Sequence, residues 1–74
     1  MTMRLSELKP KQVGIILSVN TSNDTQLSEM GFVKGAEVSK VYSTLGIAAY
    51  RLSNMTPVAI RNDMANDILI MSTH

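Results

Sequence analysis

The segment that decides the fold is Leu27–Val38, which reads LSEMGFVKGAEV. Leu27 and Met30 are three residues apart and share one helix face, and Gly31 follows where a helix end favours a left-handed residue. Phe32 comes next, at the position where a Schellman-type helix end folds an apolar side chain back on Leu27. The segment therefore predicts a tight helix stop that is followed, after a second turn, by a strand.

Short helices are expected at three places along the chain. Asn23 opens a capping-box pattern that predicts a helix over 24–30. Ser6 is a candidate N-cap for one helical turn that stops before Pro10, because proline disfavours helix at the residue that precedes it. A further turn is expected over 62–66, where an Asn-Asp pair can cap it.

Strands are expected over 12–19, 36–42, 48–52, 57–61 and 67–71. The residues that form one apolar face of the first strand are Val13, Ile15, Leu17 and Val19. Gly14 within that strand indicates a bulge or the close approach of another backbone. In the second strand the alternation breaks at Val41, as a bulge would produce. Five short strands with short helices predict a single all-β domain over residues 1–74, built as a small barrel.

The composition argues against several classes of protein. Seven Lys and Arg face six Asp and Glu, and the net charge of +1 is spread along the chain, unlike the clustered basic residues of a nucleic-acid-binding domain. The absence of cysteine excludes thiolate metal sites and cysteine nucleophiles. No apolar run approaches the roughly 18 residues of a membrane span, and the N-terminus lacks a secretory core segment. A soluble, cytoplasmic protein is expected.

No catalytic, cofactor-binding or metal-binding residue is expected. The single histidine, His74, is the last residue, and the acidic residues are separated singles, so neither a closed set of metal donors nor a carboxylate pair presents itself. Serine and threonine hydroxyls lack the usual histidine or cysteine partner. The four glycines form no nucleotide-binding motif. The sequence therefore predicts a protein that is not an enzyme.

The order and spacing of several segments resemble FeoA proteins. These segments are Leu5–Pro10, Gly14–Ile16, Val19–Asn20, Leu27–Val38, Leu45–Gly46, Tyr50–Leu52, Val58–Arg61 and Ala65–Ile70. The resemblance covers nearly the whole chain and implies a five-stranded SH3-like barrel with one or two short helices. One departure lies in the central loop, where the family often has Pro-Leu-Gly-Asp-Pro and this chain has Thr44–Ala48.

Such a barrel is found as the small cytosolic partner of the FeoB ferrous-iron transporter and as the C-terminal module of diphtheria-toxin-repressor-type metalloregulators. No winged helix precedes it here, so the resemblance favours the stand-alone transport protein, which acts by binding the cytoplasmic GTPase-containing region of FeoB. The candidate contact residues, chosen from the resemblance and their apolar character, are Leu27, Met30, Phe32, Leu45, Gly46 and Arg61.

Two other functions are kept as alternatives. A nucleic-acid-binding small barrel would need a basic stripe with stacking aromatic residues, and the chain has only two tyrosines and one phenylalanine. Tyr42 and Tyr50 can line a groove in barrels of this kind, although a structural role is expected for both. The second alternative is a metalloregulatory SH3-like module freed from its repressor.

Overall fold

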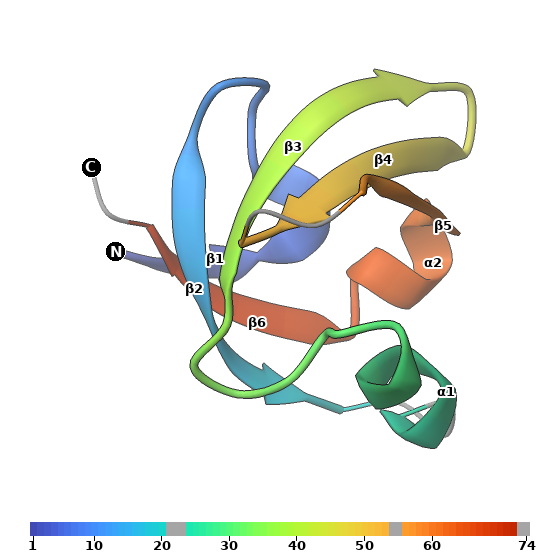
Figure 1. The fold of residues 1–74 in the computed structure, drawn as a ribbon. Coiled ribbons are helices and arrows are strands. Elements are labelled where there is room, and N and C mark those ends of the chain that lie inside the picture. Colours follow the sequence, from blue (N-terminus) through green and yellow to red (C-terminus); the bar gives the residue numbers. More distant parts are fainter. Residues whose placement is uncertain (21–23, 54–55, 73–74) are drawn as a thin grey trace.

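The computed structural model describes residues 1–20, 24–53 and 56–72, which form one strongly bent antiparallel sheet with short helices (Figure 1). In chain order the elements are β1 (Thr2–Arg4), the 3-10 helix η1 (Leu5–Glu7), β2 (Val13–Val19), α1 (Asp24–Glu29), β3 (Glu37–Thr44), β4 (Ile47–Leu52), β5 (Val58–Arg61), α2 (Asn62–Ala65) and β6 (Ile68–Ser72). The strand order is β1-β6-β2-β3-β4-β5. The predicted N-cap Asn23 and the single histidine, His74, lie outside the described residues.

The predicted all-β class is confirmed, and the described residues contain six strands where five were expected. The additional strand is β1, which pairs with β6 from Thr2 opposite Met71 to Arg4 opposite Leu69. A strand of three residues has no measurable alternation of its own. It exists because the far end of the chain supplies its hydrogen-bonding partner, and local sequence does not reveal such a partner.

The first helical turn begins two residues earlier than predicted. Arg4, and not Ser6, occupies the N-cap position of η1, and its backbone N–H donates to Glu7 Oε1 at 2.9 Å. Ser6 is instead within the turn, and its hydroxyl donates to the side-chain carbonyl of Asn66 at the end of α2. The Glu7 carboxylate thus satisfies the backbone N–H that opens this turn.

The helix stop follows the prediction closely. Gly31 has a φ of 104°, the Phe32 N–H donates to the Leu27 carbonyl at 2.9 Å, and the Gly31 N–H donates to the Ser28 carbonyl at 3.0 Å. These two bonds define a Schellman end. The α-helix itself ends at Glu29, one residue before the predicted boundary.

The facing of β2 differs from the prediction. Ile16 is fully buried, while Val13 and Ile15 on the expected apolar face are half-buried. A register shift against β6 between Ile16 and Ser18 changes the phase, so that Val19 also packs on the core. The predicted close approach at Gly14 is confirmed, because a Cβ placed there would lie 2.9 Å from Ile70 Cδ1 and 3.1 Å from the Met71 carbonyl oxygen.

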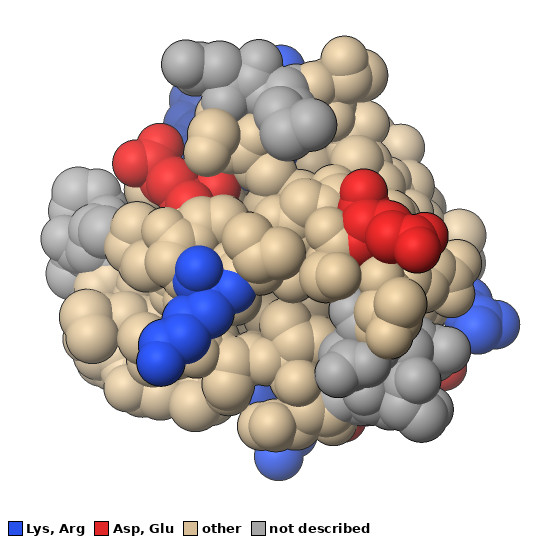
Figure 2. Space-filling view, turned by 60° about the horizontal axis from the view of Figure 1, so that its bottom comes forward, with Lys and Arg blue, Asp and Glu red and all other residues tan. Residues whose placement is uncertain are grey.

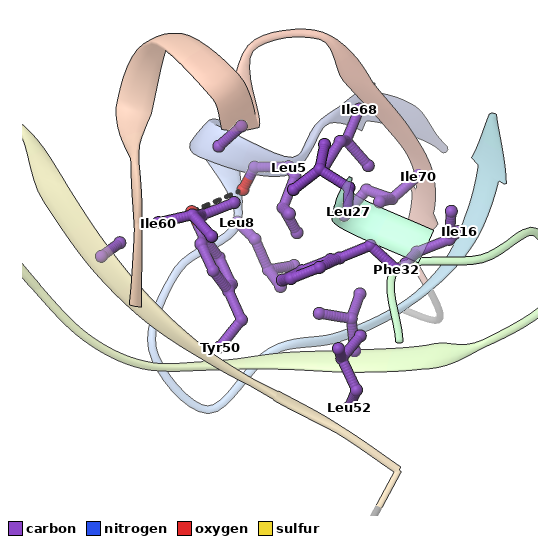
Figure 3. Packing of buried hydrophobic residues seen from close by; sticks show 13 residues of the cluster. Leu5, Leu8, Ile16, Leu27, Phe32, Tyr50, Leu52, Ile60, Ile68 and Ile70 are labelled. Atoms are coloured by element: carbon purple, nitrogen blue, oxygen red, sulfur yellow. Dashed lines mark hydrogen bonds between the residues drawn. The ribbon is translucent and has the colours of Figure 1, made fainter. Parts of the chain in front are cut away.

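One hydrophobic core fills the curve of the sheet (Figure 3). At its centre the rings of Phe32 and Tyr50 meet edge to face, with centroids 6.4 Å apart. The Tyr50 hydroxyl donates to the Leu5 carbonyl at 3.4 Å, and burial raises the pKa of Tyr50 to about 12. Lys40 lies at the edge of this core, where its Nζ donates to the Ser6 carbonyl at 3.2 Å, and burial lowers its pKa.

Candidate partner-binding surface

The turn between β3 and β4 holds the most exposed apolar side chain in the part of the chain that the structure describes. Thr44 pairs with Ile47, so Leu45 and Gly46 form a two-residue turn, and Leu45 is 98% exposed. Gly46 has a φ of 76°, and its carbonyl accepts a hydrogen bond from the Asn62 N–H at 2.8 Å. The turn is therefore tied to the start of α2.

Exposed apolar residues concentrate in residues 41–47, which we call the hairpin tip. Seven large hydrophobic residues are exposed among those described, and four of them lie in this segment. These four are Val41, Tyr42, Leu45 and Ile47. In Figure 1 the β3–β4 turn extends past the end of β5 and α2. A cluster of exposed apolar residues on a small domain is typical of an interaction site.

A β-bulge places Tyr42 on the outside of the sheet. Lys40 pairs with Tyr50 on the core side, whereas Tyr42 pairs with Ala49 on the outer side, because Val41 is the extra residue between them. This is the bulge that the broken alternation at Val41 predicts. In a regular strand without the bulge, Tyr42 would lie two residues after Lys40 and would face the core as Lys40 does. Tyr42 is instead 52% exposed.

Arg61 lies beside the hairpin tip. It is the last residue of β5 and pairs directly with Ile47. Its Nε is 3.8 Å from Asp63 Oδ1, and both side chains are exposed. Asp63 Oδ1 also accepts the Met64 N–H at 2.9 Å. The structure thus brings three of the predicted contact residues together, namely Leu45, Gly46 and Arg61.

The other predicted contact residues lie elsewhere. Leu27 is 0% exposed and Phe32 is 1% exposed, and both side chains point into the core (Figure 3). The Schellman end that joins them directs these side chains inward, so they leave the set of candidate contact residues. Met30 is half-buried and packs against the core. Tyr50 is fully buried and lines no groove.

Three residues of β4, one in the hairpin tip and two next to it, were not among the predicted contact residues. Ile47, Ala49 and Arg51 alternate along β4 with buried residues, so they share the outer side of the sheet. The same alternation is visible in the sequence, where Ala48, Tyr50 and Leu52 have the opposite phase. The strand pattern therefore contained the signal.

Within the described ranges, no group of three or more His, Cys, Asp or Glu side chains is placed to hold a metal ion, and no enclosed pocket is found. The same ranges contain no helix with the length and apolar character to cross a bilayer. On the face in Figure 2, acidic and basic residues are separate patches among uncharged residues.

The sequence model of the FeoA domain family matches residues 3–72 of this chain. The chain belongs to the FeoA domain family. Proteins of the FeoA family are accessory proteins of ferrous iron transport and have no enzymatic activity. The predicted family and the predicted absence of catalysis are therefore confirmed. No curated protein matches the chain.

Solved structures agree with this assignment. An iron uptake regulatory protein (FeoA) has a TM-score of 0.88 and 23% identity, with 97% of each chain covered. The FeoA of Stenotrophomonas maltophilia, described as an SH3 domain protein in complex with zinc, has a TM-score of 0.78 and 30% identity over 92% of this chain and 88% of its own. The predicted SH3-like fold is confirmed.

The same fold occurs in a larger regulator. A manganese-dependent transcriptional repressor has a TM-score of 0.83 and 12% identity, and the match covers 96% of this FeoA chain and 36% of the repressor. At this identity the likeness concerns the fold alone.

Proposed function

We propose that this FeoA domain is a cytoplasmic regulator of ferrous iron uptake that docks through its hairpin tip on the GTPase-containing region of FeoB. The observation that carries the proposal is the full exposure of Leu45 at the end of a hairpin whose turn is hydrogen-bonded to the start of α2. Family membership supports the transport system as the setting.

The hairpin tip is suited to binding because its backbone is already ordered. Antiparallel pairs continue to Thr44 and Ile47, and the Gly46 carbonyl is held by the Asn62 N–H. The binding of Leu45 by a partner therefore costs little conformational entropy of the hairpin backbone. Preorganised apolar anchors of this kind dominate the affinity of many interfaces.

The free energy available from Leu45 is substantial. Burying a leucine side chain completely is worth about 1.5 to 3 kcal/mol, which corresponds to roughly tenfold to a hundredfold in Kd. Since Leu45 is almost fully exposed in the free chain, nearly all of this gain remains for binding. Leu27 and Phe32 have no such area left, so substitutions there act through the fold.

The test is a binding measurement between the whole chain and the cytoplasmic region of the FeoB transporter. Leu45→Asp removes the apolar anchor and places a charge in the interface, so binding in a pull-down should be lost while the thermal midpoint stays within a few degrees of wild type. Ferrous iron uptake in cells should weaken in parallel.

Val33→Asp is the matched control. Val33 is another exposed apolar residue, but it lies directly after the helix stop and away from the hairpin tip. This variant should keep its binding. Loss of binding in Val33→Asp with retention in Leu45→Asp would move the docking surface to the end of α1 and contradict the proposal.

A further inference from the structure

The outer side of β3, β4 and β5 carries an apolar strip between two arginines. Strand register defines this outer face, because directly paired residues share a side of the sheet. Ala49 pairs with both Tyr42 and Ala59, and Ile47 pairs with both Thr44 and Arg61. The residues that we call the outer face are Tyr42, Ile47, Ala49, Arg51, Ala59 and Arg61.

The centre of the outer face is built from short side chains. Ala49 and Ala59 lie side by side, while the neighbouring positions carry the longer side chains of Tyr42, Ile47 and Arg51. Ala49 is 3% exposed although it points away from the core. Ala49 is therefore covered by its neighbours, and the apolar surface that remains open to a partner is that of Tyr42, Ile47 and Ala59.

The charges at the two ends of the strip have the same sign. Arg51 and Arg61 are exposed and lie roughly 14 Å apart along the strand direction, since four residues of β4 separate Arg51 from the partner of Arg61. Among the described residues Arg51 forms no ion pair, and Glu37, which lies two residues before the Ser39 that pairs with Arg51, is not bonded to it. The ion pair of Arg61 with Asp63 is long and exposed, so a partner carboxylate can replace it.

We propose that the outer face, together with the hairpin tip, recognises an acidic protein segment that carries a bulky apolar residue between its carboxylates. The inference rests on the proposed docking and names the chemistry of the FeoB segment that docks. Guanidinium groups pair with carboxylates through two parallel hydrogen bonds. The apolar residue of the segment packs on the exposed surface of Tyr42, Ile47 and Ala59, and Leu45 anchors the end of the interface.

A protein segment suits this surface better than a nucleic acid does. Phosphate backbones are bound by a continuous basic track with several stacking aromatic rings. The outer face has two separated arginines and one aromatic ring, with an apolar strip between them. An interface with an apolar centre and a charged rim is the ordinary anatomy of protein recognition.

The experiment measures the Kd between the whole chain and the cytoplasmic region of FeoB at about 50 and about 300 mM NaCl. The variants are Arg51→Glu, Arg61→Glu and the double variant, and Lys34→Glu is the control. Lys34 is an exposed cation in the α1–β3 loop, next to Gly35, whose N–H donates to Ile16 of β2. Thermal midpoints establish that each variant is folded.

The proposal expects wild-type binding to weaken with salt. The double variant should bind at least roughly tenfold more weakly at low salt and lose its salt dependence, whereas Lys34→Glu should change by less than about twofold. In the contrary outcome, the double arginine variant keeps both the affinity and the salt dependence of wild type while Leu45→Asp still abolishes binding. That result would contradict the proposal of an acidic segment and would leave the proposed docking unaffected. No binding by the wild type would refute the docking itself.

The same samples are tested with a fluorescent single-stranded RNA oligonucleotide. The proposal expects no saturable binding at about 300 mM NaCl. Micromolar RNA binding that the arginine reversals abolish would overturn the proposal in favour of a nucleic-acid partner.

Discussion

At the scale of single residues, Gly31 carries the largest structural consequence. Its φ of 104° allows the Phe32 N–H to reach the Leu27 carbonyl, and so places both side chains in the core. The sequence predicted this arrangement because Schellman ends depend on local spacing alone. Local spacing did not show that the same motif buries both side chains completely and removes them from any interface.

Gly31→Val should destabilise the domain by more than about 1 kcal/mol, because a β-branched residue is strained at this φ. Urea unfolding followed by circular dichroism measures the effect. Gly31→Asn is the matched control and should lose less, since asparagine tolerates positive φ better than valine does. Equal stability of the valine variant and wild type would contradict the left-handed helix stop.

At the scale of elements, the two bulges decide which side chains face the core. The bulge in β3 was predictable because Val41 breaks an otherwise regular alternation. The register shift in β2 was not, because Ile16 and the residues on both sides of it are all apolar, so either phase fits the pattern. The pairing with β6 determines which residues of β2 face the core. Local sequence does not reveal this pairing, because β6 lies at the other end of the chain.

The close approach of β2 and β6 gives a prediction of its own. Gly14→Ala should destabilise the fold by about 1 to 3 kcal/mol, because the added Cβ would lie 2.9 Å from Ile70 Cδ1 and 3.1 Å from a backbone oxygen. Ser18→Ala, in the same strand but half-buried, should change stability by less than about 0.5 kcal/mol. Similar unfolding midpoints for the two variants would contradict this prediction and show that β6 shifts to make room for the added methyl group.

At the scale of the whole molecule, the fold class and family were predictable from the sequence, and the proposed docking surface contains three of the residues that the sequence singled out. Leu45, Gly46 and Arg61 come together because β4 pairs with both β3 and β5. To assign the residues of the outer face, one must know how β3, β4 and β5 pair. The alternation within each strand does not determine that pairing.

The core also predicts how stability depends on pH. Tyr50 has a raised pKa of about 12, so between roughly pH 10 and 12 the unfolded chain releases the phenolic proton while the folded chain keeps it. Stability should therefore fall with rising pH across this window, by on the order of 2 kcal/mol. The lowered pKa of Lys40 has the opposite effect on stability. Between that lowered pKa and the ordinary value of 10.5, the folded chain has released the ammonium proton and the unfolded chain still holds it, so stability rises with pH there.

Urea unfolding at a series of pH values tests this dependence. The decline above about pH 10 should be much smaller in Tyr50→Phe than in wild type, since phenylalanine does not titrate. Parallel curves for the two proteins would mean that Tyr50 is not responsible.

Docking through the hairpin tip is tested most directly by nuclear magnetic resonance of the isotope-labelled chain during titration with the unlabelled cytoplasmic region of FeoB. The account predicts that backbone amide signals shift or broaden in residues 41–47 and 59–61, whereas those of β1 and of the described part of β6 remain in place. Changes confined to β1, β6 or α1, with residues 41–47 unaffected, would contradict it.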